Sequence, residues 1–342
     1  MMRKLKFRKK QDKEKLDNRI TNDNLVQHRE EVISSARKYK YPLRQSKHRL
    51  VVISMAIFIL AVISFFTYSM LALYKFKSES KFVYQVTKII PFPLARIGSD
   101  FVSYESYLFE INWYKHYYES QQNVDFSSDS GKGQLDDYRK RAEQKVINDG
   151  YVKKLAEEKG IKVLDKEVDQ EVEIYKSQNR LGANDDQLRT VLNDYYGWSI
   201  DDFRGTLKQK LLTQKVVAEL DKETRQKAED TLAQIKAGQD FAELAKKTSE
   251  DPSTSKSGGE IGVLIDKDNI DLSPSTIDVL FKLKSGEVSD IINVGYGLEI
   301  VKKLEEVDGK IRAAHIIFNF ENINEYLGEI KDRVDTRTYV NF

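Results

Sequence analysis

The hydrophobic residues of the chain form one long uninterrupted run and a series of shorter periodic segments. The long run extends from Leu50 to Tyr74 and contains no charged residue. About 20 apolar residues in a helix are enough to cross the hydrocarbon core of a bilayer, whereas a buried helix of a globular domain shows polar positions at helical spacing. The 49 residues before the run exceed the short leader of a cleaved signal peptide. We therefore expect one uncleaved transmembrane helix at residues 50–74.

Beyond this run, the apolar positions follow the period of amphipathic helices. The expected helices span residues 104–120, 135–158, 166–180, 185–195 and 199–220. Gly160, Gly182 and Gly197 stand at the breaks, where helices commonly end, and Ser199 with Asp202 has the spacing of a capping pair. The aromatic residues of the helix at 104–120 either form a groove that binds unfolded chains or pack against neighbouring helices. The pattern alone does not decide between the two.

Strand-like and irregular segments flank these helices. Residues 94–102 are typical of two strands joined at Gly98-Ser99-Asp100. We expect residues 75–93 to be a linker closed by the Pro91-Phe92-Pro93 turn, and the Gly/Ser-rich residues 123–133 to be a loop. The tail predicts a helix at 323–334 and a strand at 338–342, which we expect to fold back near Ile97.

Charge adds a direction to the transmembrane helix. Residues 1–49 contain 16 Lys/Arg and 6 Asp/Glu, a net charge of +10, although the whole chain carries only +2. Basic flanks stay in the cytoplasm, so the remainder is expected to be extracytoplasmic. The basic segment has few apolar anchors, which predicts a largely disordered leader near the inner leaflet. We do not expect it to bind nucleic acid.

The composition excludes several kinds of site. The chain has no cysteine, which rules out disulfides, thiol nucleophiles and cysteine-based zinc sites. Its four histidines, at positions 28, 48, 116 and 315, are scattered along the sequence. We therefore expect neither a metal site nor a cofactor.

The segment from about residue 94 to 220 resembles the N-terminal chaperone domain of SurA-like and PrsA-like foldases. Two phrases carry the resemblance. The first, LAEEKGIKVLDKEVDQEV, is a helix, a turn at Gly160 and a second helix; the other, YYGWSIDDFRGTLKQKLLTQKVV, is a glycine turn followed by a helix. The resemblance implies a mostly helical domain that binds unfolded polypeptides.

Residues 223–304 resemble the parvulin family of peptidyl-prolyl isomerases. The run TRQKAEDTLAQIKAGQDFAELAKKTSEDPSTSKSGGEIGVL matches its first helix, its second helix and its Ser-x-Asp-Pro loop ending in glycines. Downstream, VLFKLKSGEVSDIINVGYGLEIVKK matches its last helix, turn and strand. The resemblance implies a small antiparallel sheet with helices.

The first strand of that family is missing from its usual place. It reads roughly Ala-x-His-Ile-Leu and precedes the first helix, but residues 220–225 here are polar and helical in pattern. A matching phrase, KIRAAHIIF, follows the domain at residues 310–318. Too few residues remain for a second domain, so we interpret the domain as circularly permuted, with a hairpin at the favourable Asp308-Gly309 turn.

The resemblance also assigns the site. It places the first-strand histidine at His315, the loop acid at Asp251 with Ser249 beside it, and Glu299 where the family has a second histidine. A carboxylate at this position can still accept a hydrogen bond from His315, orient the ring and raise its pKa. Leu272 and Phe281 match apolar pocket positions, Thr276 stands where an aromatic residue is common, and Leu298 completes the substrate-binding set.

The resulting interpretation is an α+β chain with six parts. They are a basic cytoplasmic segment (1–49), a transmembrane helix (50–74), a linker (75–93), a SurA-like helical domain (94–222), a parvulin-like domain (223–320, with its first strand from 310–318) and a C-terminal helix and strand (321–342). We expect a single-pass, membrane-anchored foldase that acts as chaperone and isomerase on newly exported polypeptides with X-Pro bonds. The alternative is a chaperone whose parvulin fold no longer catalyses.

Overall fold

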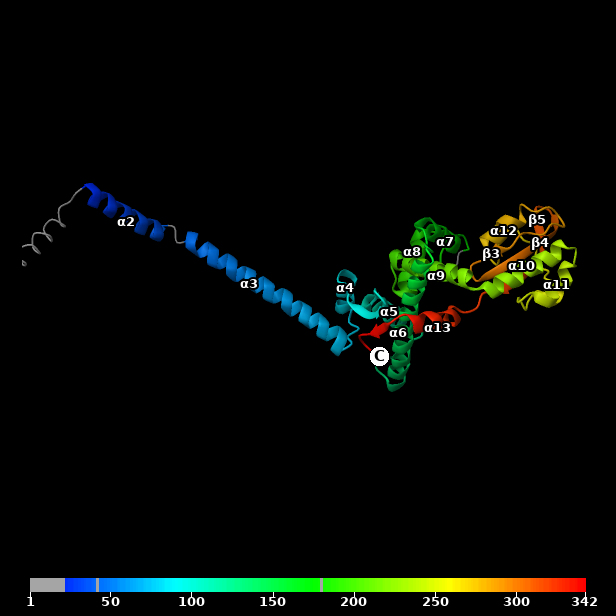
Figure 1. Ribbon diagram of the computed structural model, residues 1–342, viewed down its shortest axis with the longest axis horizontal. Helices are drawn as coiled ribbons and strands as arrows, with labels where there is room; N and C mark the ends of the chain where they lie inside the picture. Colours follow the sequence, from blue (N-terminus) through cyan, green and yellow to red (C-terminus); the bar gives the residue numbers. More distant parts are fainter. Residues whose placement is uncertain (1–21, 41–42, 179–180) are drawn as a thin grey trace, which may run out of the picture. The chain divides into compact units, whose positions relative to one another are not determined.

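The computed structural model describes residues 22–40, 43–178 and 181–342. The chain divides after Lys75 into two units. The first contains helices α2 (Asn22–Lys40) and α3 (Leu43–Met70), and α3 continues into a π-helical turn, η1 (Leu71–Lys75) (Figure 1). Among the described residues, one helix, His48–Lys75, is long and apolar enough to cross a membrane by length and composition.

Helix α2 lies where the sequence analysis expects a largely disordered leader. Its apolar residues recur seven positions apart, as Leu25 with Val32 and Val26 with Ile33. That spacing brings them to one side of a helix, because seven residues complete about two turns. Residues 43–49, also part of the expected leader, form the beginning of α3. The leader prediction for residues 1–21 and 41–42 lies outside the described residues.

The first half of the second unit is mostly helical. Two differences from the sequence prediction stand out, and in both a serine caps the helix: one helix is additional, and the other begins before the expected residue 135. Ser80 caps α4 within the expected linker, and Ser128 caps α6 within the expected loop. The predicted capping pair of Ser199 and Asp202 is present. The helices are α4 (Lys81–Ile89), α5 (Tyr104–Gln121), α6 (Asp129–Glu158), α7 (Asp165–Ser177), α8 (Asp185–Val191), η2 (Leu192–Tyr196) and α9 (Ile200–Leu220).

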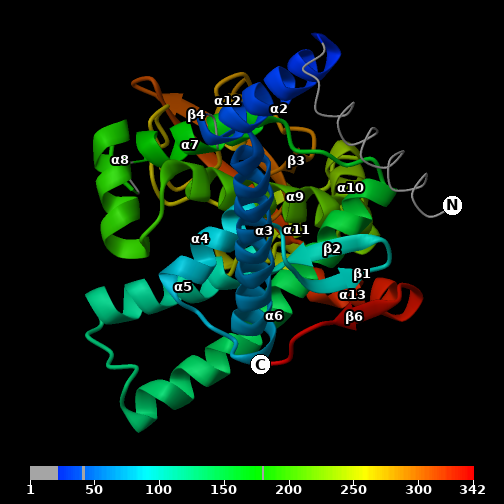
Figure 2. The ribbon, with the colours of Figure 1, turned by 90° about the vertical axis from the view of Figure 1, so that its left-hand side faces the viewer.

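A small sheet joins the tail of the chain to this helical half. Strand β1 (Pro93–Ile97) pairs on one side with β2 (Asp100–Ser103) and on the other with β6 (Thr336–Thr338) (Figure 2). The register places Ile97 opposite Thr336. The tail therefore folds back near Ile97, as the sequence predicts, although its strand, Thr336–Thr338, overlaps the expected strand 338–342 only at Thr338. Helix α13 (Ile323–Arg333) precedes it.

The second half contains a three-stranded antiparallel sheet in the order β3-β4-β5. Strands β4 (Gly297–Val307) and β5 (Lys310–Asn319) form a hairpin whose turn, Asp308-Gly309, has positive φ angles of 52° and 75°. The predicted hairpin is thus present. The remaining elements are α10 (Lys222–Lys236), α11 (Phe241–Thr248), η3 (Ser255–Ser257), α12 (Pro274–Leu280) and β3 (Ile292–Asn293).

Each face of this sheet has its own hydrophobic core. Side chains alternate between faces along a strand, so Ile300 and Ile316 pack under α10 and α11 while Val301 and Ile311 pack under α12. Figure 1 shows α10 and α11 beside β4 and β5. On its second edge, β5 is bridged to the loop before α12, through Glu260 opposite Ala314 and Ile265 opposite Ile311.

Candidate active site

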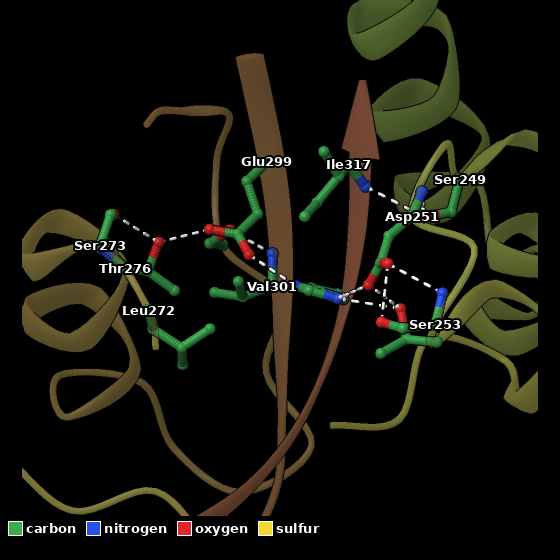
Figure 3. A network of polar contacts seen from close by, with 12 residues as sticks. Ser249, Asp251, Ser253, Leu272, Ser273, Thr276, Glu299, Val301 and Ile317 are labelled. Atoms are coloured by element: carbon green, nitrogen blue, oxygen red, sulfur yellow. Dashed lines mark hydrogen bonds and ion pairs between the residues drawn. The ribbon is translucent and has the colours of Figure 1, made fainter. Parts of the chain in front are cut away.

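Three ionisable side chains that are far apart in the sequence meet on the α12 face of the sheet. We call Asp251, Glu299 and His315 the polar centre. His315 on β5 lies opposite Val301 on β4, and Glu299 lies two residues before Val301, on the same face. Figure 3 shows Glu299 on its strand, with Asp251 on one side and Thr276 on the other. The structure therefore brings together three of the four residues that the sequence analysis assigns to catalysis.

The fourth of these residues, Ser249, fastens the Asp251 loop to β5. Its hydroxyl accepts a hydrogen bond from the Ile317 amide at 3.2 Å, and the next amide, of Glu250, donates to the Ile317 carbonyl at 2.8 Å. Further along the loop, the Gly259 carbonyl accepts from the His315 amide at 2.8 Å. Gly259 has a φ of +82°, and a Cβ there would lie 2.3 Å from the His315 carbonyl oxygen, so only glycine permits this approach.

The imidazole of His315 bridges the two carboxylates. Its Nδ1 lies 2.7 Å from Oε1 of Glu299, and its Nε2 lies 2.9 Å from Oδ2 of Asp251. An ionised carboxylate only accepts hydrogen bonds, so the ring form that pairs with two of them is the imidazolium, which carries a proton on each nitrogen. His315 and Glu299 are almost fully buried, at 5% and 2% exposure. The geometry thus defines a buried imidazolium held between two carboxylates.

The electrostatics agree with this protonation state. Burial of the ring opposes its charged form, but the hydrogen bonds and negative charges of Glu299, and then of Asp251, outweigh burial and raise the pKa of His315. Partial burial of Asp251 favours a higher pKa. Hydrogen bonds from Thr254, Ser253 and His315 outweigh it and hold the pKa of the carboxyl well below the usual range. Both shifts therefore favour the charged form of the group.

The carboxylate of Asp251 organises its own loop as well as holding the ring. Oδ1 accepts from the amide of Ser253 at 2.9 Å and from its hydroxyl at 2.7 Å, and Oδ2 accepts from the hydroxyl of Thr254 at 2.6 Å. The polar atoms of the centre thus engage one another. Within the described ranges, no group of three or more His, Asp or Glu side chains is arranged to hold a metal ion.

An apolar wall lies on the same face. Leu272 and Phe281, which flank α12 in the sequence, are partly buried against the core that contains Val301. Thr276 in this helix is fully buried and donates its hydroxyl hydrogen to Oε2 of Glu299. Leu298 does not join them. It packs into the opposite core under α10 and α11, because adjacent residues of a strand point to opposite faces, and we withdraw it as a substrate contact.

Sequence reasoning missed three residues that the structure brings to this region. Thr254 Oγ1 lies 2.9 Å from His315 Nε2, and Ser273 Oγ lies 2.8 Å from Thr276 Oγ1. The half-exposed Tyr296 has a pKa raised by partial burial and then by the charges of Glu299 and Asp251. A capping serine such as Ser273 can be expected from its position before a helix, but no local or periodic signal shows which distant residues such side chains contact.

The polar centre predicts a stability that depends on pH. A raised pKa of His315 means that its contribution is complete below the ordinary value of 6.5 and is lost as the pH rises through the raised value. The lowered pKa of Asp251 means that its contribution is present above 3.8 and is lost as the pH falls further. Urea unfolding followed from pH 4 to 10 should show the alkaline loss in the wild type and a flatter alkaline limb in His315→Gln. An identical alkaline limb in the two proteins would contradict the buried imidazolium.

Comparison with known proteins gives two family matches. Residues 42–217 match the model of the SurA-like N-terminal domain, and residues 211–305 match that of the PPIC-type PPIASE domain. The second match ends before β5, so His315 lies outside it although its side chain contacts Glu299 within it.

Two curated relatives of this chain are both named foldase protein PrsA. The foldase protein PrsA of Bacillus subtilis is 33% identical over 204 residues, which cover 53% of this chain and 66% of the relative, just under two thirds of its length. PrsA of Staphylococcus epidermidis is 28% identical over 258 residues, covering 64% of this chain and 74% of the relative. With the SurA-like match extending over more than half of its residues, this chain belongs to the family of proteins that join a SurA-like N-terminal domain to a PPIC-type PPIASE domain.

Proposed function

We propose that this protein is a membrane-anchored, extracytoplasmic foldase that isomerises X-Pro bonds in exported polypeptides and also binds these polypeptides as a chaperone. The observation that carries the proposal is the polar centre next to the apolar wall of Leu272 and Phe281, within a PPIC-type domain. The relatives that are named foldases support the same function.

Prolyl isomerisation needs no covalent chemistry. The barrier of about 18–20 kcal/mol comes from the partial double bond of the imide, which is lost as the bond twists. The apolar wall holds the proline ring, and the polar centre supplies a fixed field beside it. The dipoles and charges of the polar centre stabilise the twisted imide more than the planar one. They do not need to reorganise, because Ser249 and Thr276 hold the polar centre in place.

The alternative is a chaperone with a parvulin fold that does not catalyse. One observation favours it: the ring nitrogens of His315 and both oxygens of Asp251 are engaged within the protein. Groups with such complete internal bonding are less available to a substrate. These groups would have to act on a substrate through their electric field, or exchange one of their internal hydrogen bonds for a bond to the substrate.

We further propose that helix His48–Lys75 anchors the protein through one span with the N-terminus in the cytoplasm. The apolar run and the basic segment before it support this orientation. The catalytic and chaperone domains then lie outside, where newly exported chains emerge.

The arrangement of strands supports a circular permutation. The match to the PPIC-type domain ends at residue 305, yet β5 completes the sheet from residues 310–319 through a two-residue turn. We propose that β5 is the first strand of the family, supplied here from the far end of the domain. The boundary with the chaperone domain then falls near residue 222, where Asp221 ends α9 and caps α10.

Refolding of a client whose slow phase is proline isomerisation tests the two functions together. Full-length protein in detergent micelles should accelerate the slow phase and lower aggregation at high client concentration. Lower aggregation with an unchanged slow phase would support the non-catalytic chaperone. The absence of both effects would contradict both proposed functions. An equal amount of detergent without protein is the control.

A further inference from the structure

Thr276 is a fully buried residue whose hydroxyl group holds part of the polar centre in place. It lies in the first turn of α12, the short helix that Leu272 and Phe281 flank in the sequence. A buried hydroxyl without a partner destabilises a fold, so its hydrogen bonds indicate what keeps it there. Here they lead directly to Glu299.

The buried carboxylate of Glu299 is held from two sides. Oε1 accepts from Nδ1 of His315, and Oε2 accepts from the hydroxyl of Thr276. A carboxylate at 2% exposure has little access to water, so these donors fix its rotation about the side chain. Without Thr276, Oε2 would lose this donor, and the carboxylate would be free to rotate away from the ring.

Ser273 extends this arrangement to the backbone of α12. Since Thr276 donates its hydrogen to Glu299, its oxygen accepts from the hydroxyl of Ser273, 2.8 Å away. The Ser273 oxygen in turn accepts from the Thr276 amide at 3.0 Å, as the cap of the helix. The hydrogen bonds thus run in one direction from the cap of α12 to Glu299 (Figure 3).

We propose that Thr276 is a positioning residue of the isomerase site. It fixes the Glu299 carboxylate against Nδ1 of His315, which sets the orientation and charge of the ring. It also ties the helix that carries the apolar wall to the polar centre. The effect on rate rests on the proposed isomerase function, whereas the effect on the ring does not.

Thr276→Val in the full-length protein tests this proposal, because valine keeps the shape and removes the hydroxyl. We expect kcat/KM for an X-Pro peptide to fall about tenfold, the usual scale for losing one hydrogen bond to a charged group. In imidazole NMR, the titration midpoint of His315 should move towards the ordinary 6.5. Thr276→Ser, which restores the hydroxyl, should recover most of both properties.

Thr231→Val is the matched control. Thr231 is also buried, at 2% exposure, and donates to the Lys227 carbonyl within α10, away from the polar centre. It should change neither the rate nor the titration. Should Thr276→Val leave the His315 titration unchanged, or change rate and titration no more than Thr231→Val does, the proposal is overturned.

The two readouts separate this inference from the proposed function. If the wild type does not isomerise the peptide but Thr276→Val still shifts the His315 titration, the isomerase function fails and the positioning of the ring stands. If Thr276→Val lowers the melting temperature too far to assay, the same comparison is made with Ser273→Ala. That variant removes the donor to Thr276 and should shift the titration in the same direction by a smaller amount. An unchanged His315 titration in this variant overturns the proposal.

Discussion

Removal of residues 310–342 is expected to unfold the isomerase domain. The deletion takes away β5, which pairs with β4 on one edge and with the loop before α12 on the other. It also removes core side chains from both faces, among them Ile316 and Phe318 on one and Ile311 on the other. Each contributes about 1.5–3 kcal/mol on burial, which together approaches the 5–15 kcal/mol that stabilises a whole domain. Hydrogen exchange should show that the β4 amides lose their protection.

Deletion of residues 321–342 is the matched control for this experiment. It removes α13 and β6 but leaves the β4–β5 hairpin complete. The β4 amides should then stay protected, while the sheet of β1 and β2 loses its third strand. Protected β4 amides in the longer deletion would mean that the domain folds without β5, and the permuted arrangement would be wrong.

Replacing Glu299 by leucine is expected to destabilise the isomerase domain by about 3–5 kcal/mol, because it leaves the buried imidazolium with one carboxylate instead of two. Part of the cost is avoided if His315 loses a proton, so its raised pKa should fall at the same time. Urea unfolding at pH 6, where the wild-type ring is charged, measures the loss.

Glu305→Leu provides the comparison on the same strand. Glu305 pairs with Arg312 at 3.0 Å, but both side chains are about half exposed. An exposed ion pair contributes about 0.2–1 kcal/mol, so the free energy of unfolding of this variant should be close to that of the wild type. Equal losses in the two variants would show that burial of Glu299 has no special role.

The sequence predicted those parts of the fold that depend on local chemistry. The uncharged run from Leu50, the capping pair at Ser199 and the Asp308-Gly309 turn each specify an element through neighbouring residues. Helices α4 and α6 extend into segments whose Pro/Gly/Ser content suggested irregular structure. In α6 the reason is local: Ser128 caps the helix, and Gly131 lies so close to the Asp125 carbonyl that a Cβ would approach within 2.1 Å.

For the site, the strands and the contact between Glu299 and His315 could be predicted, whereas the hydrogen bonds from the surrounding loop and helix could not. The hairpin places Glu299 and His315 on one face by alternation, and the hydrogen bond between them follows from their chemistry. Leu298 was expected in the substrate-binding set, although alternation turns it to the opposite face of the sheet. The bonds of Thr254 and Thr276 join loops and helices distant in sequence, and no periodic pattern encodes such contacts.

The exchange rate between cis and trans forms of an X-Pro peptide, measured at equilibrium by NMR, tests the central claim most directly. The full-length protein is added in catalytic amount, with His315→Ala and Asp251→Ala in parallel. Our account predicts that the wild type accelerates exchange well above the uncatalysed process of tens to hundreds of seconds, and that both variants lose most of this acceleration. Exchange at the uncatalysed rate with the wild type, or equal acceleration by all three proteins, would contradict it.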